Sequence, residues 1–262
     1  MLISNLNQAG TNMLMLNSYL TTISKGNNMN FTDFFNSGID SINVLPNQKT
    51  YITKGKWYVR YSDKNGTKVD EGYPKELVGN WGFNESIGSF ATGFDSMATL
   101  PNKKTYVTKG EHYLRYSDNN ATVIDKGYPA LIADNWGDIA PELKLTGFDA
   151  MATLLNNKTY VFKGDSYYRY SDLNATSVDP GYPKKIAGNW GKNLPKEFLE
   201  GIDAIAVLPN GKTYMFKGDQ YIRYSDKSCS QVDQGYPLPI KDHWGFENLA
   251  VPSELNELDT IS

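Results

Sequence analysis

The stretch that decides the fold is residues 147–190, GFDAMATLLNNKTYVFKGDSYYRYSDLNATSVDPGYPKKIAGNW, which begins with Gly147-Phe148-Asp149 and ends with Trp190. Three further segments, residues 38–81, 93–136 and 201–244, carry the same landmarks in the same order. The aspartates that open the four repeats lie 55, 54 and 54 residues apart: Asp40, Asp95, Asp149 and Asp203. So regular and long a period indicates a stacked or circular array of one supersecondary unit.

Each repeat alternates short stretches rich in Tyr, Val, Ile, Phe and Thr with Pro-Asn, Lys-Gly and Asp-x-Asn clusters, which is typical of strands and turns. In the second repeat we predict strands at 96–100, 105–108 and 112–116, and a weaker fourth strand near 123–125. Nothing is long enough for a crossover helix, although residues 142–145 and 196–199 could form one helical turn each. Four short antiparallel strands per repeat are typical of a propeller blade.

The sequence therefore predicts an all-β, four-bladed β-propeller. Its domain spans residues 31–250, with blades at about 38–82, 93–137, 147–191 and 201–245. Four of the five tryptophans close a repeat, and we interpret them as packing between blades. One arginine and one lysine also recur per blade, which favours a repeated ion pair or carbonyl contact: Arg60, Arg115, Arg169, Arg223, Lys54, Lys109, Lys163 and Lys217.

The pattern Asp-Ala-x-Ala, Tyr-x-Phe-Lys-Gly-x-x-Tyr-x-Arg-Tyr, Gly-Tyr-Pro-x-x-Ile and a closing Trp resembles the hemopexin repeat, most clearly in residues 149–190. The resemblance implies a four-bladed propeller with a central tunnel, closest in type to bacterial photopexins and legume seed albumins. Animal members usually join the first and last blades by a disulfide, but this chain has only Cys229. We therefore expect the ring to close through apolar packing and strand hydrogen bonds, and Cys229 to be a partly exposed, unreactive thiol in a hairpin turn.

The hemopexin resemblance also implies an ion site on the axis of the tunnel. It assigns a first ring of backbone carbonyls to Asp40, Asp95, Asp149 and Asp203, and a second ring to Ile42, Met97, Met151 and Ile205. Such oxygens suit a hard cation, so we expect a structural Ca²⁺, with Na⁺ and Cl⁻ as further candidate ions. The alternative for the second ring is a simply packed inner strand.

The two ends of the chain lack the repeat. Residues 1–30 have no basic residue before Lys25, so we expect cytoplasmic synthesis without a Sec-type signal peptide, and release by a non-classical route stays open. Apolar residues at Leu6, Ala9, Met13 and Leu16 share one helical face, which predicts a helix that caps the propeller or forms a homodimer, with a flexible leader as the third alternative. Residues 251–262 form a C-terminal tail, and no apolar run is long enough to span a bilayer.

The sequence offers no catalytic signature, since the nucleophile elbow, the zinc helix and the phosphate-binding loop are all absent. We therefore expect a non-enzymatic protein. The net charge of −3 and the interspersed acidic residues also argue against nucleic acid as a partner. Ligand residues should lie where the repeats differ, which selects Trp57 for stacking and His112 and His243 as the only histidines for haem iron.

Three functional classes follow from these observations. The first is a hemopexin-like binding protein for haem, a polyamine or another small molecule. The second is a lectin-like or protein-interaction module, which would need repeated equivalent pockets. The third is a structural or storage protein. A single propeller with two histidines in different blades would bind haem weakly, through one histidine, or between two protomers.

Overall fold

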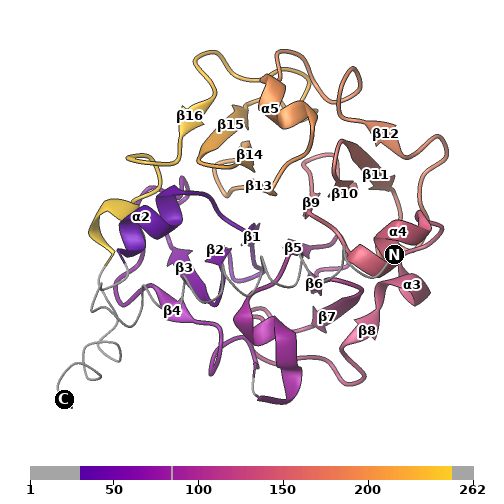
Figure 1. Cartoon of the computed structure of the whole chain (residues 1–262), viewed down its shortest axis with the longest axis horizontal. Helices are drawn as coiled ribbons and strands as arrows, with labels where there is room; N and C mark the ends of the chain where they lie inside the picture. Colours follow the sequence, from indigo (N-terminus) through magenta and orange to yellow (C-terminus); the bar gives the residue numbers. More distant parts are fainter. Residues whose placement is uncertain (1–29, 84, 250–262) are drawn as a thin grey trace, which may run out of the picture.

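The computed structural model describes residues 30–83 and 85–249, which form a ring of four sheets around a central axis (Figure 1). Each sheet consists of four antiparallel strands that are consecutive in the chain. The first strand of each blade lies nearest the axis and contacts the first strands of both neighbouring blades. The predicted four-bladed propeller is therefore confirmed.

The strands occupy the same places in every blade. The innermost strands are β1 (Ser41–Val44), β5 (Ser96–Thr99), β9 (Ala150–Thr153) and β13 (Ala204–Val207). The second strands are β2 (Thr50–Lys54), β6 (Thr105–Lys109), β10 (Thr159–Lys163) and β14 (Thr213–Lys217). The third strands are β3 (Trp57–Tyr61), β7 (His112–Tyr116), β11 (Ser166–Tyr170) and β15 (Gln220–Tyr224). The outermost strands are β4 (Lys75–Glu76), β8 (Ala130–Leu131), β12 (Lys184–Lys185) and β16 (Leu238–Pro239).

The position predicted for the fourth strand is wrong. Residues 123–125 make only a single bridge, between Tyr116 and Ile124, and the fourth strand β8 lies later, at Ala130–Leu131. The Asp118 carboxylate accepts hydrogen bonds from the amides of Asn120, Thr122 and Val123. Because this side chain satisfies the amides that a strand would use, the segment stays a loop.

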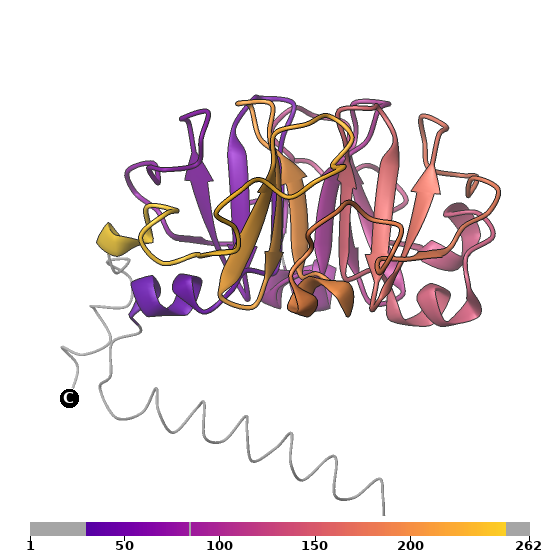
Figure 2. The same ribbon diagram turned by 90° about the horizontal axis from the view of Figure 1, so that it is seen from above.

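Most of the short helices lie at one face of the disc, beside the ends of the blades, and the rest lie at its rim (Figure 2). The two predicted helical turns are present as α4 (Pro141–Thr146) and α5 (Lys196–Leu199). The others are α2 (Phe31–Asn36), α3 (Ile132–Asn135), η1 (Glu85–Thr92) and η2 (Phe246–Asn248). Sequence reasoning missed α2, although Asn30 is a recognisable N-cap that accepts hydrogen bonds from the amides of Thr32 and Asp33.

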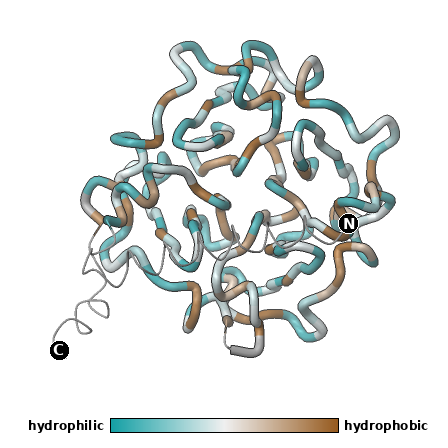
Figure 3. Tube along the Cα trace, viewed as in Figure 1, coloured by the Kyte–Doolittle hydropathy of each residue, from teal (hydrophilic) through white to brown (hydrophobic). Residues whose placement is uncertain are grey.

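The repeat-closing tryptophans pack between blades, as predicted. Hydrophobic residues recur along all four blades (Figure 3), and Trp136 of blade 2 is 2% exposed, with its ring 5.0 Å from Phe148 and 6.1 Å from Tyr170 of blade 3. The Tyr170 hydroxyl also donates a hydrogen bond to the carbonyl of Trp136 at 3.0 Å. Equivalent hydroxyl-to-carbonyl hydrogen bonds join Tyr116 to Trp81 and Tyr61 to Trp244, whereas the buried Tyr224 hydroxyl at the fourth junction has no hydrogen-bond partner among the described residues.

The ring closes through the same kind of junction. Tyr61 of blade 1 donates its hydroxyl hydrogen bond to the Trp244 carbonyl of blade 4 at 2.8 Å. Helix α2 adds a second contact, since Phe35 lies 5.1 Å from Phe246 and Thr32 donates to the carbonyl of Phe246. Closure by apolar packing is confirmed. The strand hydrogen bonds of the two terminal blades lie within each blade, because each of their sheets is complete in itself among the described residues.

Cys229 differs from the expectation of a partly exposed thiol. It is 2% exposed, and burial raises the pKa of its thiol to about 11. The hairpin turn is confirmed, because Cys229 has a φ of 50°, close to the 53° of Ala121 and 54° of Ala175 at the same repeat position. Cys229 lies in the hydrophobic cluster that blade 4 shares with blade 3, where burial disfavours a thiolate.

The recurrent arginines form the predicted repeated ion pair. In each blade an Arg Nε donates to the second Asp of the repeat at 2.5–2.6 Å, as Arg60 does to Asp70 and Arg169 to Asp179. A serine supports the same carboxylate, since Ser171 donates to Asp179 through both its amide and its hydroxyl. No helix among the described residues is long and apolar enough to cross a membrane.

Candidate ion and ligand site at the mouth of the tunnel

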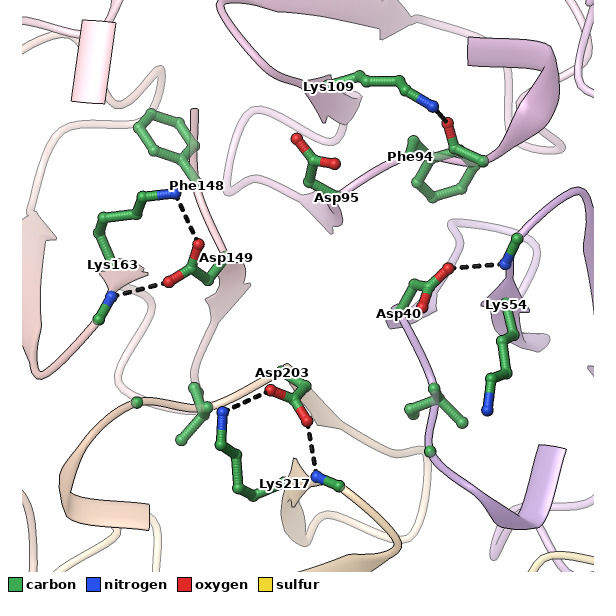
Figure 4. A pocket seen from close by; sticks show the side chains of 18 of the residues that line it. Asp40, Lys54, Phe94, Asp95, Lys109, Phe148, Asp149, Lys163, Asp203 and Lys217 are labelled. Carbon is green, nitrogen blue, oxygen red and sulfur yellow. Dashed lines mark hydrogen bonds and ion pairs between the residues drawn. The ribbon is translucent and has the colours of Figure 1, made fainter. Parts of the chain in front are cut away.

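The four repeat-opening aspartates converge on one cavity of about 780 Å³ around the axis, on the face where the helices lie (Figure 4). Each aspartate immediately precedes an inner strand, so the fourfold arrangement of β1, β5, β9 and β13 places all four side chains around the same opening. The four Lys-Gly turns between the second and third strands complete its wall. We call this cavity the tunnel mouth.

Glycines allow neighbouring blades to approach closely at the tunnel mouth. A Cβ atom on Gly147 would lie 2.2 Å from the carbonyl oxygen of Gly110, and one on Gly93 would lie 2.8 Å from that of Gly55. The same contact joins the other two pairs of blades, through Gly201 and Gly38. The Gly-x-Asp motif thus holds the Lys-Gly turn of the preceding blade against it.

Each aspartate side chain is fixed by the glycine of its own Lys-Gly turn. The carboxylates of Asp40, Asp95, Asp149 and Asp203 accept hydrogen bonds at 2.6–2.7 Å from the amides of Gly55, Gly110, Gly164 and Gly218. The spacing of the Asp and the Lys-Gly pair is therefore dictated by one hydrogen bond per blade.

The four lysines break the fourfold symmetry. Lys163 and Lys217 form ion pairs with Asp149 and Asp203 at 2.7 and 2.8 Å. Lys109 instead donates to the carbonyl of Gly93 at 2.5 Å, and Lys54 donates to the carbonyl of Phe34 and the hydroxyl of Ser37. Within residues 30–83 and 85–249, no ammonium lies within ion-pair distance of Asp40 or Asp95. The ion pair predicted for the lysines is therefore present in blades 3 and 4, and the predicted carbonyl contact is present in blades 1 and 2.

Burial has the largest effect on the pKa values of the two aspartates that lack an ion pair. It raises the pKa of Asp40, although the Gly55 amide and the Lys54 charge oppose the rise, and the charge of Asp95 adds a smaller increase. Burial likewise raises the pKa of Asp95, with an added contribution from Asp149. Burial lowers the pKa values of Lys54 and Lys109. Burial at the tunnel mouth therefore disfavours the charged form of both the aspartates and the lysines.

Acid should destabilise the fold, because seven other half-buried carboxyls have depressed pKa values: Asp63, Asp118, Asp125, Asp172, Asp179, Asp226 and Asp233. Burial opposes the depression, but hydrogen bonds from backbone amides, serines and arginines outweigh it. Their stabilisation is present above the unfolded pKa of about 3.9 and is lost as the pH falls through the folded values.

Asp40 and Asp95 have raised pKa values in the folded state, so protonation of these two groups favours folding. The seven half-buried carboxyls with lowered pKa values outnumber them. We expect the urea midpoint to fall steadily below about pH 4. Urea titrations between pH 7 and pH 2.5 would measure it. Asp179→Asn should flatten the dependence, and a midpoint that stays constant down to pH 2.5 would contradict the assignment.

The predicted second carbonyl ring falls on buried inner-strand residues. Ile42, Met97, Met151 and Ile205 are each 1% exposed. No group of three or more His, Cys, Asp or Glu side chains in the described part of the chain is arranged to hold a metal. A cation here would therefore depend on backbone oxygens, and both carbonyl rings remain predictions.

The other predicted ligand residues lie apart from the tunnel mouth and from one another. Trp57 is a correction: it is 4% exposed and packs with its ring 4.8 Å from Phe31 of α2, so it offers no face to a ligand. His112 starts β7 in blade 2 with its side chain 42% exposed. His243 is exposed in blade 4, where Nδ1 lies 2.9 Å from the Lys241 carbonyl oxygen. Because blades 2 and 4 are not adjacent, the two histidines are not brought together.

The predicted N-terminal helix and its dimer contact, like the C-terminal tail, lie outside the described residues.

Comparison with known proteins supports the repeat assignment. The family model described as Hemopexin matches residues 94–139, 148–191 and 202–248, which together make up more than half of the chain. Vitronectin of Sus scrofa is 32% identical over 170 residues, which cover 58% of this chain. The chain spans about a third of the length of that relative, since the match covers 33% of it.

Solved structures share the fold. A hemopexin-fold protein from cow pea has a TM-score of 0.65 and 23% identity, and the match covers 79% of this chain and 96% of that one. A plant lectin with two metal-binding sites from Cicer arietinum has a TM-score of 0.64 and 22% identity, with 79% and 95% covered. The family model leaves out residues 38–81, yet the structure gives that segment the same four-stranded blade. The chain therefore belongs to the hemopexin family.

Proposed function

We propose that this chain is a non-enzymatic ligand-binding propeller that holds a cation, Ca²⁺ by preference, at the mouth of its central tunnel. The observation that carries the proposal is the pair of carboxylates, Asp40 and Asp95, which face a cavity of about 780 Å³ with no lysine of the described residues within ion-pair distance. Two neighbouring carboxylates without an ion pair would attract a positive charge. The metal sites of the Cicer arietinum lectin support the proposal by analogy of fold.

Calcium would coordinate backbone oxygens, with the carboxylates attracting it electrostatically, because hard cations prefer oxygen ligands. Asp40 and Asp95 are already held by glycine amides, so they keep their positions whether or not an ion is bound. The chemistry that the ion would supply is structural, since it would cross-link the four blades at the axis.

The two aspartates without an ion-paired lysine also favour an organic cation over haem as a second ligand of the tunnel mouth. A polyamine could place an ammonium near Asp40 and Asp95, and the cavity is large enough for such a chain. Haem would need an axial donor, but His112 and His243 belong to opposite blades. Haem therefore ranks below the polyamine, and a haemin titration of His112→Ala and His243→Ala would test it.

The test of the axial cation combines elemental analysis with thermal unfolding of the full chain. We expect about one calcium per chain at millimolar calcium, and a melting temperature that falls by a few degrees when a chelator removes it. Asp95→Asn should keep the calcium stoichiometry, because asparagine retains an acceptor for Gly110 and all backbone oxygens remain, while the affinity drops a few-fold.

Two results would count against the proposal. Wild-type protein that holds no metal at millimolar calcium would exclude the axial cation. Complete loss of calcium in Asp95→Asn would show that the carboxylate is itself a ligand, which the carbonyl assignment does not allow. Ser37→Ala, at a residue that contacts Lys54 and not the aspartates, is a control expected to keep the metal content of the wild type.

A further inference from the structure

A second hollow lies in blade 1, at its junction with blade 2. This groove has a volume of about 740 Å³ and is lined by three tyrosines and three cationic residues: Tyr51, Tyr58, Tyr73, Lys49, Arg60 and Lys75. Asn120, from the Asp118 loop of blade 2, forms part of its wall. We call it the blade 1 groove. It does not overlap the tunnel mouth, with which it shares no lining residue.

The positive charges of the blade 1 groove are held in place by aromatic and ionic contacts. The Arg60 guanidinium lies 5.1 Å from the centre of the Tyr73 ring, while its Nε is fixed by Asp70 at 2.5 Å. The Lys75 ammonium lies over the same ring, also at 5.1 Å. Cation–π contacts of this kind orient a charge before a ligand arrives, which reduces the entropy lost on binding.

The wall of the groove is also preorganised. The Asn47 side-chain amide donates to the Tyr51 hydroxyl and to the side-chain oxygen Oδ1 of Asn120, each at 3.0 Å. The backbone amide of Lys49 in turn donates to Asn47 at 2.9 Å. Residues from two blades are thereby locked to one another around the groove. A site built on rigid strands and satisfied hydrogen bonds keeps its shape when a ligand enters.

The lining identifies the chemical class of the ligand. Among the described residues that line the blade 1 groove there is no acidic and no aliphatic side chain. An apolar ligand would therefore find little aliphatic surface, whereas an anion would meet three cations. Tyrosine hydroxyls, asparagine amides and aromatic rings suit a molecule that carries hydroxyl groups over a ring framework. An acidic saccharide has both properties.

Blade 4 provides an internal comparison. Its equivalent groove has a volume of about 300 Å³ and contains Tyr214, Tyr221, Arg223 and Tyr236, but Leu238 stands where blade 1 has Lys75. The Tyr-Arg framework therefore recurs as part of the repeat, since Arg223 lies 5.0 Å from the Tyr236 ring centre. The additional lysine and the larger volume distinguish blade 1 from blade 4, whereas blade 3 also has a lysine at this position, Lys184, whose ammonium lies 5.1 Å from the Tyr182 ring centre. The position after Gly-Tyr-Pro is thus a candidate determinant of specificity.

From these observations we infer that the blade 1 groove binds an acidic saccharide, with the anionic group between Arg60 and Lys75 and the sugar hydroxyls against Tyr51 and the asparagine amides. The anion is a carboxylate or a sulfate, both of which match the hydrogen-bonding fork of a guanidinium. This saccharide site is distinct from the proposed cation site, since the blade 1 groove and the tunnel mouth have no lining residue in common.

Calorimetric titration of the full chain with 3′-sialyllactose, sulfated lactose and neutral lactose tests the inference. We expect at least one of the acidic sugars to bind and lactose to bind at least tenfold more weakly, with affinity that falls as salt rises. The comparison of the two acidic sugars distinguishes a carboxylate from a sulfate. Lys75→Leu, which gives blade 1 the residue of blade 4, should weaken binding about fivefold or more.

Lys126→Leu is the matched control, because it removes the same charge from an exposed position that does not line the groove. It should change affinity less than twofold. The inference fails if neither acidic sugar binds at millimolar concentration, if lactose binds equally well, or if Lys75→Leu behaves like Lys126→Leu. Calcium content measured on the same samples keeps this result separate from that of the axial cation.

Discussion

Trp136→Ala is expected to lower the free energy of unfolding by about 3–5 kcal/mol, which is typical for the loss of a buried large aromatic side chain. Trp136 is 2% exposed and lies between blades 2 and 3, where it contacts Tyr106, Phe148 and Tyr170. Its removal would leave a cavity that backbone on both sides cannot fill. Urea unfolding followed by tyrosine and tryptophan fluorescence would measure the change.

Val123→Ala is the control for this experiment, because Val123 is 65% exposed and belongs to the same pair of blades. It should change stability by no more than about 0.5 kcal/mol. If Trp136→Ala were no more harmful than Val123→Ala, the tryptophan could not be holding the blades together. A loss confined to one of several unfolding transitions would show that blades unfold independently.

Gly147→Ala is expected to cost about 2–4 kcal/mol, because overpacking and backbone strain add at this position. A Cβ would lie 2.2 Å from the Gly110 carbonyl oxygen, and the backbone angles, φ 71° and ψ −163°, are open essentially only to glycine. Since Gly147 lies at the tunnel mouth, separating blades 2 and 3 there should also weaken binding of the axial cation.

Gly211→Ala is the matched control, with a similar φ of 76° and no atom within 4 Å of an added Cβ. It reports the backbone penalty without the clash and should cost about 1–2 kcal/mol. Thermal unfolding of both variants would separate the two contributions. Equal melting temperatures for Gly147→Ala and Gly211→Ala would mean that the blades have room to move apart.

The repeat period made the propeller predictable because each landmark has a local physical role. The Asp of Gly-x-Asp receives an amide hydrogen bond from the Lys-Gly turn, and the Arg of each third strand pairs with the second Asp. These contacts lie within one repeat, so four copies reveal them. The outer strand was misplaced because the Asp118 side chain replaces strand hydrogen bonds, a competition that strand propensity does not register.

Contacts between repeats were harder to predict. Because Trp57 has no counterpart in the other repeats, the sequence predicts it to be a ligand residue. In the structure Phe31 of α2 covers it, and α2 is held in turn by its contact with Phe246 after blade 4. The two arrangements of the recurrent lysines also depend on neighbours that differ between blades, such as Phe34 and Ser37. A comparison of repeats identifies the contacts that all blades share. The burial of Trp57 and the two lysine arrangements arise instead from contacts with segments that differ from blade to blade.

The completeness of each sheet has a consequence for the order of the blades along the chain. In the described part of the chain no strand of one blade belongs to the sheet of another, and the junction of Tyr61 with Trp244 repeats those of Tyr116 with Trp81 and of Tyr170 with Trp136. Circular permutation should therefore be tolerated: a chain that starts at residue 140, with blade 4 linked to α2, would preserve every strand pairing. The covalent chain is interrupted between blade 4 and blade 1, but the side-chain packing continues across this boundary.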